Sequence, residues 1–370
     1  MTSRRAFALL AFATVVLAAC RPVALPNAPA GTAASSVLVD VNPDPAVTDE
    51  RAVDNPDPFV LAVDPSYCDT GSGPPAACYY VYSTQVYFNI TPVMRSSDLV
   101  HWQLAGIDSP ADADPWPNGE ARTSVSPWSD LFGHWAPAVL PRPSSPGARF
   151  VMWYAAQSHV DPTSGFHCLG VATADSPDGP FVDDATAPAY CQTDQGGTID
   201  PSPFVDADGT PYLLYKTEGT SAIPTRLWIS QLSADGRSVV PGTEHLLLEN
   251  DQRPGSWEFP VTEAPAMVRT PSGLFLFYSA YYWSSPSYKI GVARCDTPIG
   301  PCRRIYNTPL VESRGAMLGP GGETPFVSAS GQWYLAFHAW TSPNVGYDSG
   351  GLRSLRILPL SFPSGSPSVG

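Results

Sequence analysis

The chain has 370 residues, of which 34 are Asp or Glu and 20 are Lys or Arg, so its formal charge is −14. Its 42 prolines accompany a hydrophobic fraction of 43% and an aromatic fraction of 11%, which is too apolar for a disordered protein and favours many short strands joined by turns. The basic residues are scattered, which argues against nucleic acid or an anionic membrane as the main partner, because both require clustered Lys and Arg.

The amino terminus has the pattern of an export signal. Residues 6–19 form an apolar run that follows Arg4 and Arg5 and is too short to span the roughly 30 Å hydrocarbon core of a bilayer. The run ends in Leu-Ala-Ala followed by Cys20, which resembles a bacterial lipobox. We therefore predict a lipoprotein signal peptide over residues 1–19 and a lipidated Cys20 that anchors the protein at the bacterial cell surface. Ordinary cleavage and secretion is the alternative.

Cys20 is one of seven cysteines, and the six that remain form an even set, which suggests disulfides in an exported protein. The sequence does not determine their connectivity, but sequential pairs lie close together in the chain. Three disulfides that each close a short local loop are therefore the simplest arrangement. No CxxC pair is present and the six histidines are scattered, which argues against a metal site. The disulfide candidates are Cys68, Cys78, Cys168, Cys191, Cys295 and Cys302.

One sequence unit recurs five times after the first fifty residues. Each unit has a proline followed by a hydrophobic pair, then a turn, then a strand rich in aromatic residues. The prolines are Pro58, Pro137, Pro203, Pro265 and Pro325, and the aromatic strands cover residues 79–82, 150–154, 212–215, 274–278 and 333–337.

These units predict an all-β fold, because no helical periodicity interrupts them. Five strand-only repeats of similar length are typical of a five-bladed β-propeller, in which the innermost strand of each blade faces a central channel. A long β-sandwich is the alternative, but it explains neither the even spacing nor the aligned aromatic strands. We therefore assign residues 20–48, rich in Ala, Pro and Ser, to a tether, and residues 49–365 to one propeller domain.

Three carboxylates flank the recurring prolines in different repeats, namely Asp57, Asp200 and Glu263. Any one of them alone is better explained as the start of a strand after a turn. Equivalent positions of different blades converge at the mouth of a propeller channel, so their recurrence predicts one acidic cluster. Crowding and desolvation separate the pKa values of clustered carboxylates. Hydrolysis of a glycosidic bond requires that separation, because one acid protonates the leaving oxygen while a carboxylate activates water.

The order and spacing of these motifs resemble glycoside hydrolase family 43, five-bladed propellers that hydrolyse arabinose- or xylose-containing glycans with inversion. The resemblance extends from Asp54 to Phe362. It is carried by residues 56–60, 79–82, 96–102, 134–137, 199–202, 263–265 and 337–340.

The resemblance implies roles for individual residues. Asp57 corresponds to the general base, Glu263 to the general acid, and Asp200 to the residue that raises the pKa of Glu263 and orients it. Arg353 matches a late arginine that contacts the substrate or the equivalent of Asp200 in relatives, although a surface position in a strand is the simpler alternative. One departure concerns Gly322, which stands where many members carry a histidine that reaches a channel metal or water network. We therefore expect no required cofactor and disfavour structural calcium in the channel.

Other candidates come from the chemistry of sugar recognition. The C–H face of a sugar stacks on aromatic rings, so Trp135 is the best candidate for the first subsite, and Trp116, on the long loop between the first two repeats, is a candidate for the pocket wall. Glu323 adds a fourth carboxylate. It either lies near the channel mouth and binds substrate hydroxyls or a cation, or it begins a strand and faces solvent. Lys216 and Glu218 either face the cleft or form a solvated pair.

Together these features predict an inverting glycosidase of the α-L-arabinofuranosidase or β-xylosidase type. Its partner is a carbohydrate from arabinose- or xylose-containing plant-type polysaccharides or oligosaccharides. We expect a monomer that meets the membrane only through its lipid anchor. The alternative is a non-catalytic cell-surface propeller that binds glycans or proteins, which would tolerate Gly322 and needs no acid triplet.

Overall fold

The computed structural model describes residues 39–40, 54–69, 71–108, 119–142 and 144–370. The predicted signal peptide, Cys20, Trp116 and all but two residues of the predicted tether lie outside the described residues. Within the described ranges, every regular element is a β-strand or a short 3-10 helix, so the predicted all-β class is confirmed. A helix with the length and apolarity needed to cross a bilayer does not occur in that part of the chain.

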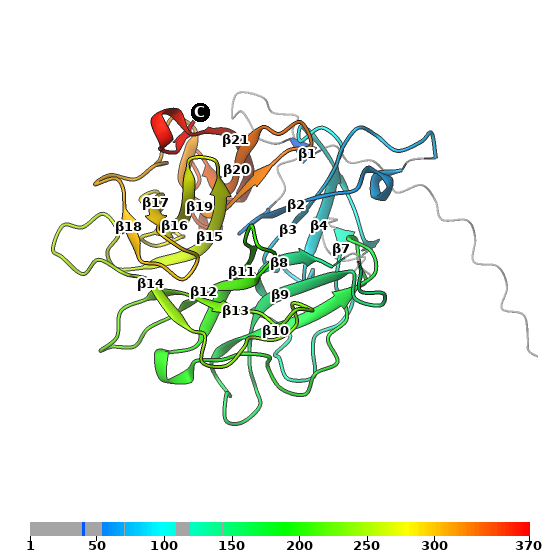
Figure 1. The fold of residues 1–370 in the computed structure, drawn as a ribbon, viewed down its shortest axis with the longest axis horizontal. Coiled ribbons are helices and arrows are strands. Elements are labelled where there is room, and N and C mark those ends of the chain that lie inside the picture. Colours follow the sequence, from blue (N-terminus) through cyan, green and yellow to red (C-terminus); the bar gives the residue numbers. More distant parts are fainter. Residues whose placement is uncertain (1–38, 41–53, 70, 109–118, 143) are drawn as a thin grey trace, which may run out of the picture. The chain divides into compact units, whose positions relative to one another are not determined.

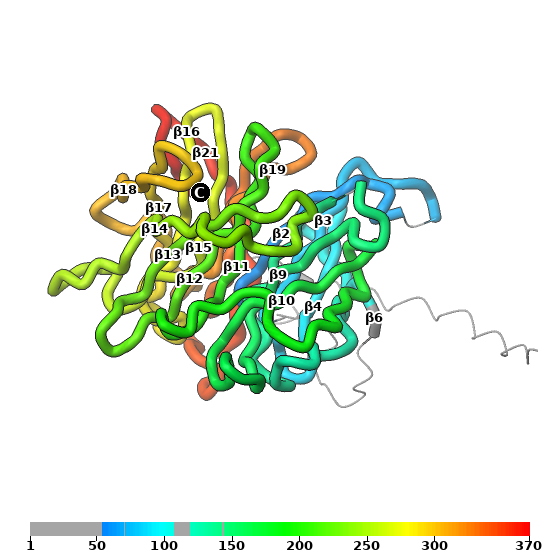
Figure 2. The backbone as a smooth tube through the Cα atoms, turned by 60° about the horizontal axis from the view of Figure 1, so that its bottom comes forward, coloured from blue at the N-terminus to red at the C-terminus, as the bar shows by residue number. Residues whose placement is uncertain are grey.

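The described strands form five sheets that follow one another around a common centre in chain order, as the colours in Figure 1 show and as Figure 2 traces from a tilted view. The innermost strands of neighbouring blades contact each other, and blade five contacts blade one, which closes the ring. The five-bladed β-propeller predicted from the repeats is therefore confirmed. The innermost strands are β2 (Phe59–Val63), β8 (Trp135–Pro141), β11 (Thr198–Val205), β15 (Thr262–Thr270) and β19 (Met317–Val327).

The aromatic strands of the sequence repeat are the second strands of the blades, and each pairs antiparallel with the innermost strand. They are β3 (Cys78–Tyr82), β9 (Phe150–Gln157), β12 (Pro211–Thr217), β16 (Gly273–Ala280) and β20 (Trp333–Thr341). Their successive side chains point into the layers on both faces of the blade, so Trp153 and Trp340 are completely buried. Full burial of a large apolar side chain contributes about 1.5–3 kcal/mol, so these rings stabilise the contacts between blades.

The remaining strands complete the blades outward. The third strands are β4 (Pro92–Ser96), β10 (His167–Ala174), β13 (Arg226–Gln231), β17 (Lys289–Cys295) and β21 (Arg353–Ser361), and the outer strands are β5 (His101–Leu104), β14 (His245–Glu249), β18 (Cys302–Arg304) and β22 (Ser368–Val369). Blade one adds β1 (Val39–Asp40), β6 (Ile107–Asp108) and β7 (Gly119–Glu120). The 3-10 helices are η1 (Pro65–Cys68), η2 (Thr193–Gln195), η3 (Tyr347–Ser349) and η4 (Pro363–Gly365).

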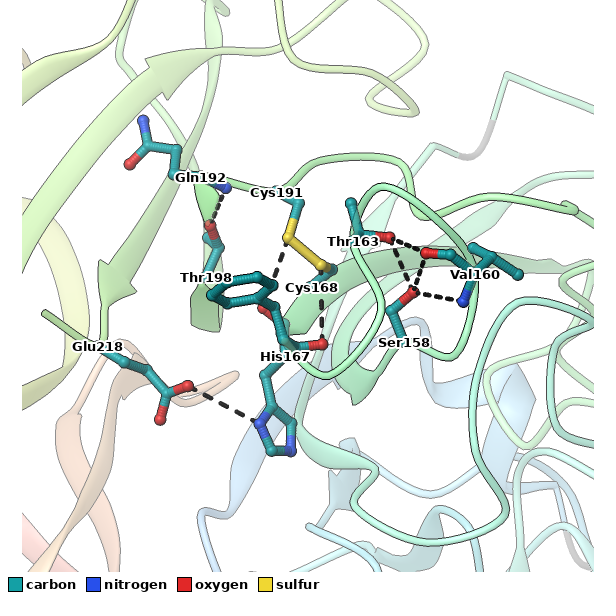
Figure 3. Close-up of a disulfide and its surroundings, with 10 residues drawn as sticks. Ser158, Val160, Thr163, His167, Cys168, Cys191, Gln192, Thr198 and Glu218 are labelled. Carbon is teal, nitrogen blue, oxygen red and sulfur yellow. Dashed lines mark hydrogen bonds and ion pairs between the residues drawn. A yellow bond between two sulfur atoms is a disulfide. The ribbon is translucent and has the colours of Figure 1, made fainter. Parts of the chain in front are cut away.

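Three disulfides join the cysteines in the sequential pairs that their spacing favours, so the predicted local disulfides are confirmed. The pairs are Cys68–Cys78 in blade one, Cys168–Cys191 in blade two and Cys295–Cys302 in blade four. The second of these ties the start of β10 to the segment that leads into β11, beside His167 (Figure 3). A cross-link of this kind stabilises the fold chiefly by restricting the unfolded chain.

A left-handed residue lies at a corresponding position of every blade, within the innermost strand in blades two to five and two residues before β2 in blade one. These residues are Asp57, Ala136, Asp200, Ala264 and Gly322, with φ between 45° and 63°. In blades two to five the interruption coincides with a register shift of the strand pair, which is a β-bulge. Such a bulge bends the strand and re-aims the side chains next to it.

The bulges also connect neighbouring blades, because side chains of the preceding blade accept their backbone N–H groups. The N–H of Asp57 donates to His338 Nδ1 (3.0 Å) and that of Ala264 donates to Asp200 Oδ2 (2.8 Å). Thr84 and Ser279 hydroxyl oxygens accept the corresponding bonds in blades two and five. Contacts between blades therefore help to position the residues at the axis.

The positions of the bulges show that the alignment of the five repeats made from the sequence is wrong by two residues in two blades. The residues that follow the left-handed position are Pro58, Pro137, Pro201, Pro265 and Glu323. Two of the prolines used to define the repeat, Pro203 and Pro325, therefore lie two residues after the structural equivalents of Pro58. Asp57 and Asp200 occupy equivalent positions, whereas Glu263 precedes its bulge residue.

Candidate active site

A cavity of about 670 Å³ opens at the axis of the propeller, at the level of the bulges, and residues of all five blades line it. It contains five of the side chains predicted from the sequence to form the site: Asp57, Trp135, Asp200, Glu263 and Arg353. The expectation that acids distant in the chain converge at one place is therefore met. The volume is in the ordinary range for small-molecule sites in proteins.

Asp57 is held from two sides and remains partly open to the cavity. Thr84 donates its hydroxyl to Asp57 Oδ2 at 2.7 Å, and the guanidinium of Arg353 lies 3.5 Å from the same oxygen. Nδ1 of His338 lies 3.4 Å from Asp57 Oδ1, but it accepts the backbone N–H of Asp57 and therefore carries no proton of its own. Burial lowers the pKa of His338 well below its ordinary value, so this imidazole is neutral. Arg353 is thus the cation that pairs with Asp57.

Glu263 has a defined partner at each carboxylate oxygen. Lys216 Nζ lies 2.8 Å from Oε2, and the hydroxyl of Tyr288 donates to Oε1 at 2.8 Å. Burial opposes the positive charge of Lys216, but the neighbouring Glu263 and Asp200 outweigh burial and raise the pKa of the lysine. A buried cation therefore stands directly beside this acid.

The carboxyl of Asp200 lies close enough to Glu263 and Asp57 for both negative charges to raise its pKa. Desolvation raises the pKa of Asp200 to about 7, and repulsion from Glu263 adds to the effect, while attraction to Lys216 opposes it. Its Oδ2 accepts the N–H of Ala264, the residue next to Glu263. The Asp200 carboxyl therefore exchanges a proton near neutral pH and holds the backbone beside Glu263.

Arg353 is buried among rings and has a fixed orientation. Its guanidinium lies 4.6 Å from the centre of the Trp283 ring, and its Nε donates to the Tyr347 hydroxyl at 2.9 Å. Tyr347 in turn donates to Asp54, which accepts the backbone N–H of Arg353. Its charged partner in the acid cluster is Asp57, whereas the resemblance suggested Asp200 or the substrate. The surface alternative considered for Arg353 is wrong, because only 7% of the residue is exposed.

Trp135 contributes a ring to the cavity wall and stacks on His167, with ring centres 3.8 Å apart and planes inclined by 21°. Burial lowers the pKa of His167 to about 4, so the ring is neutral at ordinary pH. Figure 3 shows Glu218 directed toward His167, with Oε2 3.7 Å from Nδ1. Lys216 and Glu218 both line the cavity. Of the two alternatives for these residues, facing the cleft or forming a solvated pair, the structure therefore supports the first.

Glu323 lines a second, much smaller cavity of about 40 Å³, which shares Asp57, Asp200 and Ala264 with the larger one. It is buried, so the solvent-facing alternative is wrong, and it is not among the residues that line the larger cavity. Its Oε2 accepts the hydroxyl of Ser279 at 2.5 Å, while Oε1 has no hydrogen-bond partner among the described residues. Burial raises the pKa of Glu323 to about 8, so the carboxyl is protonated at neutral pH.

Gly322 is glycine for a local steric reason. Its φ is +63°, and a Cβ atom there would lie 2.7 Å from both Asp57 Oδ1 and His338 Nδ1. The imidazole of His338 therefore occupies the space that a side chain at position 322 would need. Across the described residues, His, Cys, Asp and Glu side chains form no group of three or more with the geometry of a metal site.

Several residues of the site were not assigned from the sequence: Thr84, Tyr288, His338 and Tyr347. His338 belongs to one of the stretches that carry the family resemblance, so the sequence pointed to this residue but did not indicate what it does. The other three contribute hydroxyl groups from positions outside the strands, Tyr347 at the start of η3, where Thr and Tyr are too common for a sequence pattern to mark them.

The axial cavity of this five-bladed propeller is lined by five carboxylate residues, a buried lysine and a buried arginine. Carboxyl groups brought together in this way can act as the acid and the base in the hydrolysis of a glycosidic bond. The chain belongs to glycosyl hydrolases family 43, whose family model matches residues 54–367. The family expected from the motifs is therefore confirmed.

Individual relatives agree with this assignment. The chain is 27% identical over 297 residues to the arabinoxylan arabinofuranohydrolase of Bacillus subtilis (strain 168), covering 72% of this chain and 52% of that protein. It is 23% identical over 271 residues to the extracellular endo-alpha-(1->5)-L-arabinanase 2 of the same organism, covering 68% of this chain and 52% of that protein. The chain thus spans about half the length of these curated relatives. The crystal structure of a thermostable family-43 glycoside hydrolase superposes with a TM-score of 0.67 at 26% identity, covering 85% of this chain and 92% of that one.

Proposed function

We propose that the protein is an inverting glycosidase that releases arabinose or xylose units from plant-type polysaccharides or oligosaccharides, with an α-L-arabinofuranosidase or β-xylosidase type of activity. The observation that carries the proposal is the convergence of Asp57, Asp200 and Glu263, from blades one, three and four, on one cavity. The family assignment supports hydrolysis of a glycosidic bond, and the relatives' names support pentose-containing substrates.

Asp57 is the proposed general base. It takes a proton from a water molecule while that water's oxygen bonds to the anomeric carbon from the face opposite the leaving group. Thr84 and Arg353 keep its carboxylate in one orientation, and Arg353 supplies a balancing positive charge. A base needs this fixed geometry, because a misplacement of about 1 Å costs roughly 10²-fold in rate.

Glu263 is the proposed general acid, which donates its proton to the glycosidic oxygen as the bond from that oxygen to the anomeric carbon breaks. Asp200, with its pKa of about 7, keeps a proton available within the acid cluster near neutral pH and positions the backbone next to Glu263. Tyr288 and Lys216 fix the two oxygens of Glu263. The products are a sugar with inverted anomeric configuration and the free alcohol of the leaving group.

A panel of aryl arabinofuranosides and xylosides tests the activity and the roles. Asp57→Ala is expected to lower kcat/KM by about 10²–10⁴ with every leaving group. Glu263→Ala is expected to lose as much on substrates with poor leaving groups and much less on a dinitrophenyl glycoside, which needs no proton. Asp208→Ala, in the exposed turn between β11 and β12, is the matched acid control.

The stereochemistry provides an independent check. Proton NMR during the first minutes of hydrolysis is expected to show the inverted anomer first. The retained anomer, or wild-type activity of Asp57→Ala, would contradict the proposed mechanism. No turnover on the whole panel would favour the non-catalytic binding propeller instead.

We further propose that the protein is exported, lipid-anchored through Cys20 and monomeric, and that it requires no cofactor. The export pattern of residues 1–19 and the extracellular relative support export. Mass spectrometry of the mature amino terminus and fractionation of Cys20→Ala cells test the anchor. Unchanged activity after chelation of divalent cations is the expected result for the cofactor proposal.

A further inference from the structure

An aromatic surface lies beside the cavity, at the tip of a tight hairpin between β3 and β4. Val86 and Asn89 exchange backbone hydrogen bonds of 3.1 and 3.0 Å, which leaves Tyr87 and Phe88 at the tip. Tyr87 is 62% exposed and Phe88 is 59% exposed, and Phe132 of the next blade, 52% exposed, packs its ring 5.8 Å from that of Phe88. We call Tyr87, Phe88 and Phe132 the aromatic platform.

The platform is held in place by one network of hydrogen bonds. The side-chain amide of Gln85 donates to the carbonyl oxygens of Tyr87 and Leu131, at 3.1 Å each. The backbone N–H of Gln85 also donates to the carbonyl of His134, whose own N–H donates to Gln85 Oε1. Tyr87 has a left-handed φ of 50°, a conformation that costs a bulky residue about 1–2 kcal/mol. The structure therefore presents these rings to solvent on a rigid and partly strained support.

The platform is continuous with the cavity. Gln85, Val86 and Tyr87 belong to the cavity wall, together with Asp57 and Trp135. Phe88 and Phe132 are not among the residues that line the cavity and extend the same aromatic surface outward.

A second pair of exposed rings lies on the part of the cavity wall that blade four contributes. Tyr282 is 51% exposed and Trp283 is 40% exposed, and both line the cavity. Blade four is not a neighbour of blade one in the ring, so exposed rings flank the cavity on two separate sides.

The surface lacks the charges that other partners would require. Residues 85–89 and 131–133 contain no Asp, Glu, Lys or Arg. An anionic membrane would need basic residues among the rings. Contiguous exposed apolar surface marks a binding site, and flat aromatic rings next to a sugar-cleaving cavity match the C–H faces of uncharged sugars.

We propose that the aromatic platform binds main-chain sugars of a polysaccharide next to the unit that enters the cavity. The substrate class of the enzyme is therefore a polymer, with short glycosides as poorer substrates. This inference rests on the proposed glycosidase function, because the same chain of sugars must reach both the cavity and the platform.

The test compares two substrates on the double variant Phe88→Ala/Phe132→Ala, which removes the rings outside the cavity. On soluble arabinoxylan and linear arabinan, kcat/KM is expected to fall about tenfold, equivalent to about 1.4 kcal/mol. On an aryl arabinofuranoside, which does not extend to positions 88 and 132, kcat/KM is expected to change less than twofold. Phe88→Tyr/Phe132→Tyr keeps the rings and is expected to restore polymer activity, and Leu246→Ala, an exposed apolar residue on β14, is the matched surface control.

Affinity electrophoresis in gels that contain each polysaccharide separates this inference from the proposed function. Loss of retardation in the alanine variant, with wild-type retardation in the tyrosine variant, supports the platform even if no aryl glycoside is cleaved. Unchanged retardation and unchanged polymer kcat/KM in the alanine variant would overturn it. A shift from dimer to monomer in sedimentation with unchanged retardation would also overturn it and assign the surface to self-association.

Discussion

Replacing Gly322 with alanine is expected to displace the carboxylate of Asp57, the proposed base, although the substitution neither adds nor removes a charged residue. The new Cβ would lie 2.7 Å from Asp57 Oδ1, whereas an ordinary contact begins at 3.4 Å. The Asp57 carboxylate or the bulge must therefore move by about 0.7 Å. Because a displacement of about 1 Å costs roughly 10²-fold in rate, we expect kcat/KM to fall by one to two orders of magnitude.

The substitution also strains the backbone, so a control must separate strain from displacement. At φ +63° an alanine costs about 1–2 kcal/mol whatever surrounds it. Gly331, in the turn between β19 and β20, has φ +84°, and a Cβ atom added there would meet no other atom within 4 Å. Gly331→Ala therefore introduces the backbone strain without a steric clash, and serves as the control.

The assays are kcat/KM on an aryl arabinofuranoside and the melting temperature of each variant. Both variants are expected to melt a few degrees below the wild type. Only Gly322→Ala is expected to lose activity. Wild-type kcat/KM in a folded Gly322→Ala would refute the reasoning, because it would show that the position of the Asp57 carboxylate does not govern the rate.

Two further predictions concern buried charge. Lys216→Met removes the cation whose attraction lowers the pKa of Asp200, so the alkaline limb of the pH profile of kcat/KM is expected to move to higher pH. Lys216→Arg keeps the positive charge and is expected to keep the wild-type profile. A shift of the alkaline limb to lower pH in Lys216→Met would be inconsistent with this coupling. Glu323, with its pKa raised by burial from 4.5 to about 8, binds a proton more tightly in the folded state, so its contribution to stability is present at low pH and is lost as the pH rises from about 4.5 to 8. Glu323→Gln is expected to gain melting temperature relative to the wild type across that range in thermal scans, and parallel profiles for the two proteins would contradict the prediction.

The sequence by itself was sufficient for the architecture and for the choice of three acids that line one cavity. Five aromatic strands, each preceded by a proline and a turn, are local features, and their regular recurrence leaves the propeller as the fold that buries all of them. The disulfides were equally accessible, because short loops bring sequential cysteines together. Asp57, Asp200 and Glu263 could be chosen because their distance from the repeated prolines is visible in the chain.

The register within each blade came only from the tertiary structure. Pro203 and Pro325 match the repeat in sequence but lie two residues after the true equivalents of Pro58. A β-bulge inserts one extra residue into the innermost strand, and no residue type marks that insertion reliably. For the same reason the sequence suggests that Glu323 begins a strand at the surface, whereas the structure places it inside β19, buried in the smaller cavity.

The partners of the acids were also decided by the tertiary structure. Lys216 pairs with Glu263, and Arg353 pairs with Asp57, although each pair joins different blades. Gln85 connects the hairpin of blade one to the loop that carries Leu131. Local sequence patterns determine which residues form a strand, but contacts between neighbouring blades depend on how five blades close into one ring. That closure selects the neighbours of each acid, and hence its charge and its geometry.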